Sequence, residues 1–178
     1  IFLLMVIIWD MGSLLLQVGL LVVDDAGLIN WAVSLIELGF AGSSVALYSL
    51  TTVTIGVHNH RFRAMTFASL LLIIFYRLFL ITSTTPRIIV DIDNLSAYQL
   101  QPLFVPFYLL FGCATLFWLW QSRRKIRSSG LKAGIIIFLL GQSLIFVNPT
   151  LVVASFTTST SFFGVLMVSV AIIQQEIM

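Results

Sequence analysis

Three ionisable residues, Asp10, Glu37 and Arg77, lie inside long apolar runs of the sequence. A charge within a membrane span is costly, so such residues face the interior of a helix bundle or water and often mark ligand, ion or proton sites. Glu37 and Arg77 lie at similar depths on consecutive antiparallel segments, which predicts an ion pair. That pair would either fix helix register or act as a ligand site or switch. Asp10 has no obvious basic partner; we expect it to be protonated or hydrogen-bonded, and a proton-coupled role is the alternative.

Other residues that could bind a metal ion or act in catalysis lack the partners that such chemistry needs. His58 and His60 could touch one metal ion, but no Cys, Asp or Glu nearby completes a site, which favours a basic interfacial anchor. The run 39–44 (GFAGSS) superficially resembles an intramembrane serine protease site, but no His follows in a later span to act as a base. The sequence therefore predicts no catalytic residue, no metal and no cofactor in this chain.

The elements that must position these residues are membrane-spanning helices. Of the 178 residues, 60% are hydrophobic and 9% are charged, far from soluble composition. Continuous apolar runs of about 20 residues are typical of transmembrane helices, whereas barrels have alternating segments of about ten. Six such runs cover about 1–23, 28–57, 64–83, 102–121, 133–147 and 151–174. We therefore expect an all-α, polytopic transmembrane bundle of six spans, with residues 1–178 forming a single domain.

The basic residues orient this bundle. They gather in the gaps after the second and fourth spans, at Arg61, Arg63, Arg123, Arg124, Lys125, Arg127 and Lys132, whereas the other gaps are acidic or nearly neutral. Basic gaps mark the cytoplasmic side of a membrane protein. Both ends of the chain are then cytoplasmic, and one further span upstream would give seven in all. Because these cations flank a membrane, we expect the lipid bilayer as the partner and no nucleic acid.

Small and hydroxyl residues within the spans predict close helix packing. Gly39, Gly42, Ser43 and Ala46 form a small-residue stripe on the second span. Such stripes let helices approach closely. The hydroxyl-rich run 157–161 in the last span can bond back to its own helix or to a neighbour.

The end of the chain, 170–178 (VAIIQQEIM), resembles the exit of the last span in polytopic sensor regions of bacterial histidine kinases. The stretch Gly141-Gln142-Ser143-Leu144 and the stretch Tyr76-Arg77-Leu78 are also similar to that group. The resemblance implies a bacterial plasma-membrane sensor, a homodimer, and a last helix that continues into a cytoplasmic signalling helix. The phosphoacceptor His and the ATP-binding motifs of a kinase are not in this sequence.

The sequence thus favours an input module that passes an unknown ligand or membrane stimulus to a cytoplasmic effector, as a piece of a longer protein. The polar segment 84–101 is the best place for a stimulus to act, and the intramembrane pair is the second. A small transporter or channel subunit, with Asp10, Glu37 and Arg77 along a polar path, is the alternative. For a membrane-embedded enzyme the sequence offers no catalytic constellation.

Overall fold

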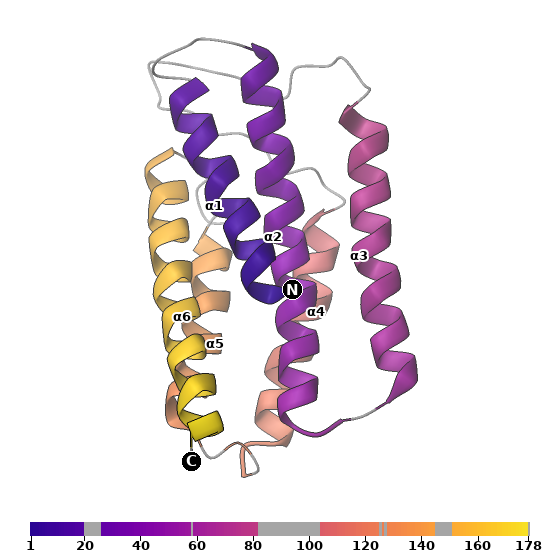
Figure 1. Cartoon of the computed structure of the whole chain (residues 1–178), viewed down its shortest axis with the longest axis vertical. Helices are drawn as coiled ribbons and strands as arrows, with labels where there is room; N and C mark the ends of the chain where they lie inside the picture. Colours follow the sequence, from indigo (N-terminus) through magenta and orange to yellow (C-terminus); the bar gives the residue numbers. More distant parts are fainter. Residues whose placement is uncertain are drawn as a thin grey trace.

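The chain folds into α-helices alone in the part that the structure describes. The computed structural model describes residues 1–19, 26–57, 59–81, 104–124, 126, 128–144 and 151–177, and excludes the side chains of 26, 77–81, 104, 151–159 and 175–177. The helices are α1 (Phe2–Val18), α2 (Ala26–Thr54), α3 (His60–Ile81), α4 (Phe104–Gln121), α5 (Ser129–Ser143) and α6 (Leu151–Ile177). They run side by side as an elongated bundle (Figure 1).

Local hydrogen bonds define where α2 ends and α5 begins. Gly56, with a φ of 79°, follows α2, and the N–H groups of Gly56 and Val57 donate to the carbonyls of Val53 and Thr52. This is a Schellman ending, which needs the left-handed backbone that glycine adopts without strain. At α5, the hydroxyl of Ser128 accepts a hydrogen bond of 3.2 Å from the N–H of Leu131. Serine is a favoured residue at this N-cap position.

The apolar runs predicted the number and order of these helices, but two helices begin earlier than hydrophobicity alone indicated. α3 begins at His60 and α5 at Ser129, so Arg61, Arg63 and Lys132 lie in first helical turns rather than in the connecting gaps. The reason is capping. Asn59 accepts a hydrogen bond of 2.9 Å from the N–H of Arg61 through its side chain, as Ser128 does for α5. Polar caps outside an apolar run therefore extend each helix beyond it.

α1 and α2 form a hairpin in which the two backbones almost touch. A Cβ atom on Gly39 would lie 2.6 Å from the Cα of Trp9, and one on Gly12 would lie 2.7 Å from the backbone nitrogen of Ile36. Neither position has room for a side chain. A Cβ on Gly42 would also collide with Met5, at 2.7 Å from its sulfur. The predicted role of the small-residue stripe in close packing is confirmed for Gly39 and Gly42, and the partner is α1.

α5 and α6 form a second hairpin of the same kind. A Cβ on Gly134 would lie 2.9 Å from the carbonyl oxygen of Gly164, and one on Gly164 would lie 2.6 Å from the backbone nitrogen of Phe138. One turn further along, a Cβ on Gly141 would lie 2.9 Å from the backbone nitrogen of Ser161. Three small-residue contacts along one seam hold α5 and α6 as a unit.

α2 is the central helix of the bundle, because it packs against α1, α3, α4 and α5. Its residues from Phe40 to Tyr48 are all buried, including three small polar or glycine positions. α3 packs mainly on α2, meets α4 through an edge-to-face contact between Phe62 and Trp118, and lies at the edge of the bundle (Figure 1).

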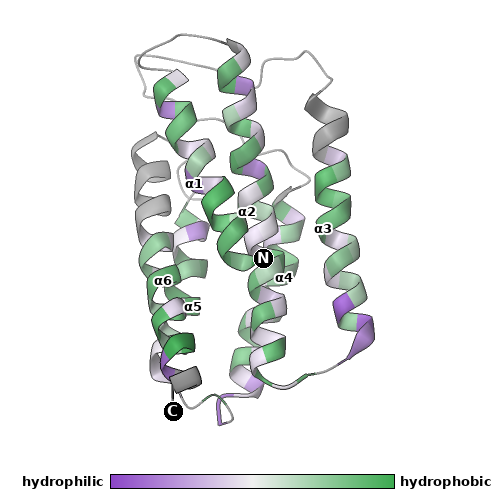
Figure 2. Cartoon of the chain, viewed as in Figure 1, coloured by the Kyte–Doolittle hydropathy of each residue, from purple (hydrophilic) through white to green (hydrophobic). Residues whose placement is uncertain are grey.

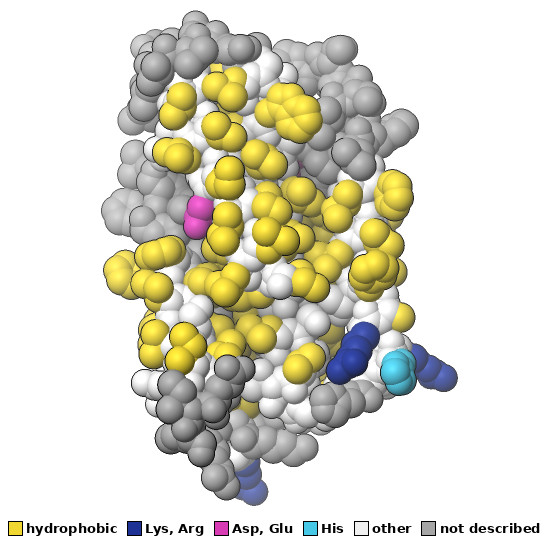
Figure 3. Space-filling model, in the orientation of Figure 1, with side chains coloured by type: hydrophobic (Ala, Val, Ile, Leu, Met, Phe, Trp, Pro, Cys, Tyr) yellow, Lys and Arg dark blue, Asp and Glu magenta, His cyan; other side chains and the backbone are white. Residues whose placement is uncertain are grey.

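The bundle is apolar on its outer surface and carries polar side chains in its interior. All six helices expose large hydrophobic side chains, among them Phe67 at 64%, Phe75 at 65% and Trp120 at 66%. Figure 2 shows hydrophobic residues along most of the helices, and Figure 3 shows them covering much of one face, with basic side chains at one end. Glu37, Ser43, Ser44, Thr115 and Gln142, by contrast, are completely buried. The interior also contains a large hydrophobic core, so the feature that departs from an ordinary soluble domain is the apolar outer surface.

Among the described residues, one helical stretch, Gly27–Thr54, is both long and apolar enough to cross a bilayer. Shorter apolar helices accompany it, such as Phe2–Val18 and Ser129–Ser143. By length and composition alone, a core helix of a soluble protein or a signal sequence near the amino terminus would qualify as well.

Replacing Gly39 or Gly134 by alanine tests the two hairpin seams. The added methyl group would collide with backbone, so we expect each variant to lose about 1–3 kcal/mol of stability. Gly112→Ala is the matched control, because its Cβ would lie 3.6 Å from the nearest side chain, an ordinary contact. Alanine also favours helix over glycine there. Thermal unfolding of the purified variants measures the difference, and equal losses at all three positions would contradict the seams.

Candidate functional site: a buried polar cluster at Gln142

A closed hydrogen-bond network joins α5 to α2 through the side chain of Gln142. Its amide nitrogen donates to the hydroxyl of Ser43 at 2.8 Å and to the carbonyl oxygen of Phe40 at 3.2 Å. Its amide oxygen accepts a hydrogen bond of 3.0 Å from the hydroxyl of Ser44. The hydroxyl of Ser43 in turn donates to the Phe40 carbonyl at 2.9 Å. Both amide protons and the amide oxygen of Gln142 are therefore engaged.

This network is completely buried, so its hydrogen bonds affect how α2 and α5 pack together. Gln142, Ser43 and Ser44 each have no exposed surface. A buried polar group without a partner costs about 1–3 kcal/mol, so an arrangement that satisfies every donor favours one relative position of α2 and α5. A shift of one residue along either helix would separate these partners. The cluster is thus a register-specific link between the two hairpins.

An aromatic layer surrounds the polar cluster. Trp9 of α1 meets Phe40 of α2 edge to face, with ring centroids 5.5 Å apart, and meets Phe138 of α5 at 6.4 Å. Tyr108 of α4 lies 5.4 Å from Phe40, measured between ring centroids. The two Trp9 pairs are edge to face and the Tyr108 pair is tilted, all at spacings that are usual for aromatic pairs. Four helices therefore converge at the level of Phe40, whose carbonyl is also part of the network.

Tyr108 adds a second polar link to α5. Its hydroxyl donates a hydrogen bond of 2.8 Å to the carbonyl oxygen of Leu139, and the side chain is buried. Leu139 lies one helical turn before Gln142, so α4 and α2 both contact the same stretch of α5. This stretch of α5 is fixed from two sides.

The residues predicted as an intramembrane ion pair lie on neighbouring helices. Glu37 is completely buried on α2, one turn before Phe40, and α3, which carries Arg77, packs against α2. The side chain of Arg77 is outside the described part, so the pair stays a prediction. Asp10 follows the buried Trp9 on α1 and is itself partly exposed. Glu37 and Asp10 therefore have different surroundings, one enclosed by the bundle and one at its edge.

The basic residues whose side chains the structure describes all lie at one end of the bundle. Arg61 and Arg63 occupy the first turn of α3, and Arg123 and Arg124 follow α4. Lys132, in the first turn of α5, donates a hydrogen bond of 2.7 Å to the carbonyl oxygen of Arg123. The α2–α3 and α4–α5 connections and the end of α6 share this end (Figure 1).

Several predicted positions fall outside the described residues. They are His58, Lys125 and Arg127, together with the polar segment 84–101 and the side chains of the hydroxyl residues 157–159. His60 is described and exposed at the start of α3. Among the described residues no group of three His, Cys, Asp or Glu side chains gathers as metal ligands would.

Gln142 was not predicted as a site residue: in the sequence it stood out only within the resembling stretch 141–144, and Ser43 only as part of a small-residue stripe. Two signals could have found it. Gln142 is a polar residue inside an apolar run, and it stands beside Gly141, where helices can approach closely. Its partners, by contrast, lie about a hundred positions earlier, and no local pattern joins them.

Comparison of the chain with protein-family models, with curated proteins and with solved structures found no match. The cluster contains amide and hydroxyl groups that are already bonded to one another. Such an arrangement can hold two helices in a defined position and release them when its hydrogen bonds are exchanged; it presents no nucleophile beside a base.

A double-mutant cycle between Gln142→Ala and Ser44→Ala tests the link across α2 and α5. Because the two side chains share a buried hydrogen bond, we expect a coupling energy of about 0.5–2 kcal/mol in the free energy of unfolding. Gln121→Ala, at an exposed glutamine at the end of α4, is the matched control and should show no coupling to Ser44→Ala. Strict additivity in both cycles would contradict the network.

Proposed function

We propose that this chain is a polytopic helical bundle embedded in a bacterial plasma membrane, and that it serves as the sensor or input module of a signal-transduction protein. A histidine kinase is the proposed cytoplasmic output, as the resemblance of the last helix implies. A homodimer, and a small ligand or a membrane stimulus, belong to the same proposal.

The observation that carries the membrane part of the proposal is the apolar outer surface of the bundle. All six helices expose large hydrophobic side chains, whereas the serine, threonine, glutamine and glutamate side chains of the centre are buried. A soluble monomer rarely exposes a contiguous apolar patch beyond a few hundred Å². In a bilayer the same surface faces lipid, and buried polar groups bond between helices.

The position of the cations supports the proposed orientation. Arg61, Arg63, Arg123, Arg124 and Lys132 all lie at the end of the bundle where α6 finishes. Under the positive-inside rule this end is cytoplasmic. The last helix would therefore deliver its movement to the cytoplasmic side.

The arrangement of the hairpins supports a sensor mechanism. α5 and α6 share the glycine seam at Gly134, Gly141 and Gly164 and would move together. The hairpin α5–α6 packs less closely on α1, α2 and α4 than its own two helices pack on each other, and the Gln142 network is specific for the register of α5 on α2. A stimulus that exchanges those hydrogen bonds would shift α5, and α6 would carry the shift to its cytoplasmic end. Small helix displacements of this kind are a common form of switching.

Single-cysteine labelling tests the orientation. In a background in which Cys113 is replaced by alanine, Gly27→Cys places a thiol at one end of α2 and Ser129→Cys places one at the basic end. Both positions are exposed. In intact cells a membrane-impermeant maleimide should label Gly27→Cys and should label Ser129→Cys only after permeabilisation. The reverse pattern would overturn the orientation, and equal labelling in intact cells would overturn the membrane-embedded bundle.

The signalling role can be tested with the full chain joined in frame, after Met178, to a histidine-kinase catalytic region. Gln142→Leu removes the α2–α5 network, and we expect it to change autophosphorylation by about fivefold or more, the lower range of allosteric coupling. Gln121→Leu, on the exposed end of α4, should leave the activity unchanged. Comparable expression and thermal stability of the two variants are checked first.

Two outcomes would overturn the sensor role. One is identical kinase activity for Gln142→Leu and Gln121→Leu. The other is solute uptake by proteoliposomes that contain the chain, if Glu37→Gln abolishes that uptake. The second result would establish a transporter with Glu37 on its path.

A further inference from the structure

The outer face of α1 carries two polar residues within an apolar stripe. The stripe consists of five residues at alternating intervals of four and three positions: Leu3, Ile7, Asp10, Leu14 and Gln17. Its three apolar side chains are between 50% and 61% exposed, Gln17 is exposed, and Asp10 is partly exposed. Figure 3 shows an acidic side chain among hydrophobic ones on the surface of the bundle. Residues at this spacing form the seam along which two helices of a coiled coil pack.

Asp10 and Gln17 carry hydrogen-bonding groups that lipid could not satisfy. Asp10 lies at the middle of α1, and neither side chain makes a hydrogen bond to another described residue. Ser13, between them, differs, because its hydroxyl donates to the carbonyl oxygen of Trp9 at 3.1 Å. A polar side chain that faces hydrocarbon is costly unless it finds a partner on another helix. In the proposed membrane, the stripe therefore needs polar partners at two depths.

A second copy of the chain offers both partners. Two copies that have the same orientation in a bilayer, related by a two-fold axis along its normal, place equal residues at equal depths. Asp10 would then meet its own equivalent, and so would Gln17. A neutral carboxyl group and a primary amide each contain a donor and an acceptor, so each can pair with its own kind. A helix of another protein would have to match both groups at the same seven-residue interval.

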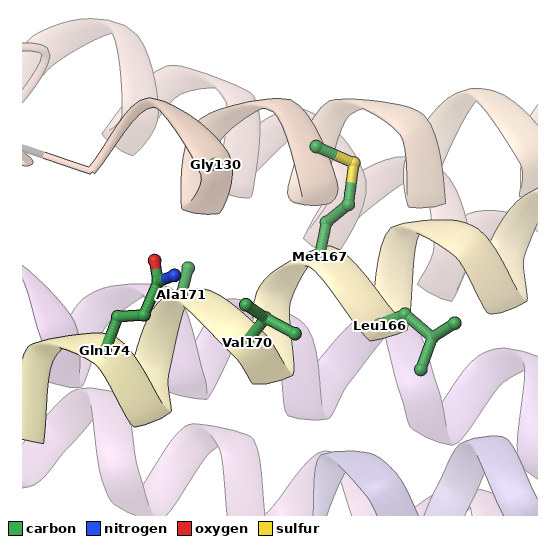
Figure 4. A pocket seen from close by; sticks show the side chains of 6 residues that line it. All are labelled: Gly130, Leu166, Met167, Val170, Ala171 and Gln174. Carbon is green, nitrogen blue, oxygen red and sulfur yellow. The ribbon is translucent and has the colours of Figure 1, made fainter.

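α6 exposes an apolar stripe of the same spacing but offers no such reason for pairing. Leu166, Val170 and Ile173 are 44%, 51% and 55% exposed. The neighbouring polar residue, Gln174, lies in the last turn of α6, and its side chain points toward the beginning of α5 (Figure 4). At the end of a span an amide can reach water or lipid headgroups. This stripe therefore serves as the control surface.

We propose that two copies of this chain pair through the α1 stripe, with Asp10–Asp10 and Gln17–Gln17 hydrogen bonds across the two-fold axis. Polar residues at such seams fix register and oligomeric state. The inference rests on the membrane-embedded part of the proposed function and assigns an interface to the proposed homodimer. Because α1 and α2 interlock at Gly12 and Gly39, the dimer contact would be joined directly to the central helix.

Disulfide cross-linking of the full chain in native membranes tests the interface. In a background in which Cys113 is replaced by alanine, Leu14→Cys places a thiol on the α1 stripe. Val170→Cys on α6 and Phe75→Cys on α3 are the matched controls, because these positions are also exposed. A disulfide needs Cα atoms within about 7 Å of each other, so we expect a covalent dimer from Leu14→Cys and little from either control. Cross-linking of Leu14→Cys that is no more efficient than that of a control would overturn the proposal.

Leucine substitutions test the polar pairs. Asp10→Leu combined with Gln17→Leu keeps the stripe apolar but removes both pairs, so we expect the dimer dissociation constant to rise by about tenfold. Asp10→Asn keeps a group that pairs with its own kind and should dimerise like the unchanged chain. Gln121→Leu, at an exposed glutamine of α4, is the matched control and should have no effect. Sedimentation in detergent measures the dimer, and thermal stability shows that each variant is folded.

Two further results would overturn the proposal. One is an undiminished dimer in the double leucine variant. The other is a chain that stays monomeric both in detergent and in membranes, which would leave the α1 stripe to a helix of another protein. Failure of the membrane part of the proposed function is measured separately, because the chain would then remain in the soluble fraction of cell lysates without detergent.

Discussion

The close approach of α1 to α2 at Gly39 is the contact on which the rest of the bundle depends. At this point the Cα of Trp9 lies where a side chain would otherwise stand, so the two backbones define each other's position. Trp9 is thereby placed between Phe40 and Phe138, where its ring joins α1 to both α2 and α5. The aromatic layer and the polar cluster beside it are assembled around that fixed ring.

The contacts within each hairpin differ in kind from the contacts between the two hairpins, and this difference determines where the bundle can move. Within each hairpin, glycine lets backbones pack at a distance that leaves no freedom for sliding. Between the hairpins, side chains make the contacts, and the specific ones are the hydrogen bonds of Gln142 with Ser43, Ser44 and the Phe40 carbonyl. Hydrogen bonds can be exchanged at small cost when new partners are available, whereas interlocked backbones cannot. Movement is therefore expected between the hairpins rather than within them.

In the proposed membrane setting, one physical requirement accounts for the buried polar side chains and the apolar exterior. A helix that faces lipid needs no polar surface, and any polar side chain it carries must find a partner inside the bundle. Ser43 and Ser44 on α2 and Gln142 on α5 satisfy this requirement by bonding to one another. The cations satisfy it differently, because Arg61, Arg123 and their neighbours lie at the end of the bundle, where water and lipid headgroups would receive them.

The sequence by itself determined the number of helices, their approximate limits and the gathering of the cations in two gaps. Hydrophobicity, turn residues and capping residues act over a few positions, so the local sequence contains them. The starts of α3 and α5 were predicted too late, because Asn59 and Ser128 extend these helices. The sequence also indicated that Gly39 and Gly42 serve close packing. Only the tertiary structure decided that α1 is their partner, that Gly134 and Gly164 form a second seam, and that Gln142 meets Ser43 across 99 positions. Helix pairing depends on how whole surfaces fit together, and no short stretch of sequence contains that information.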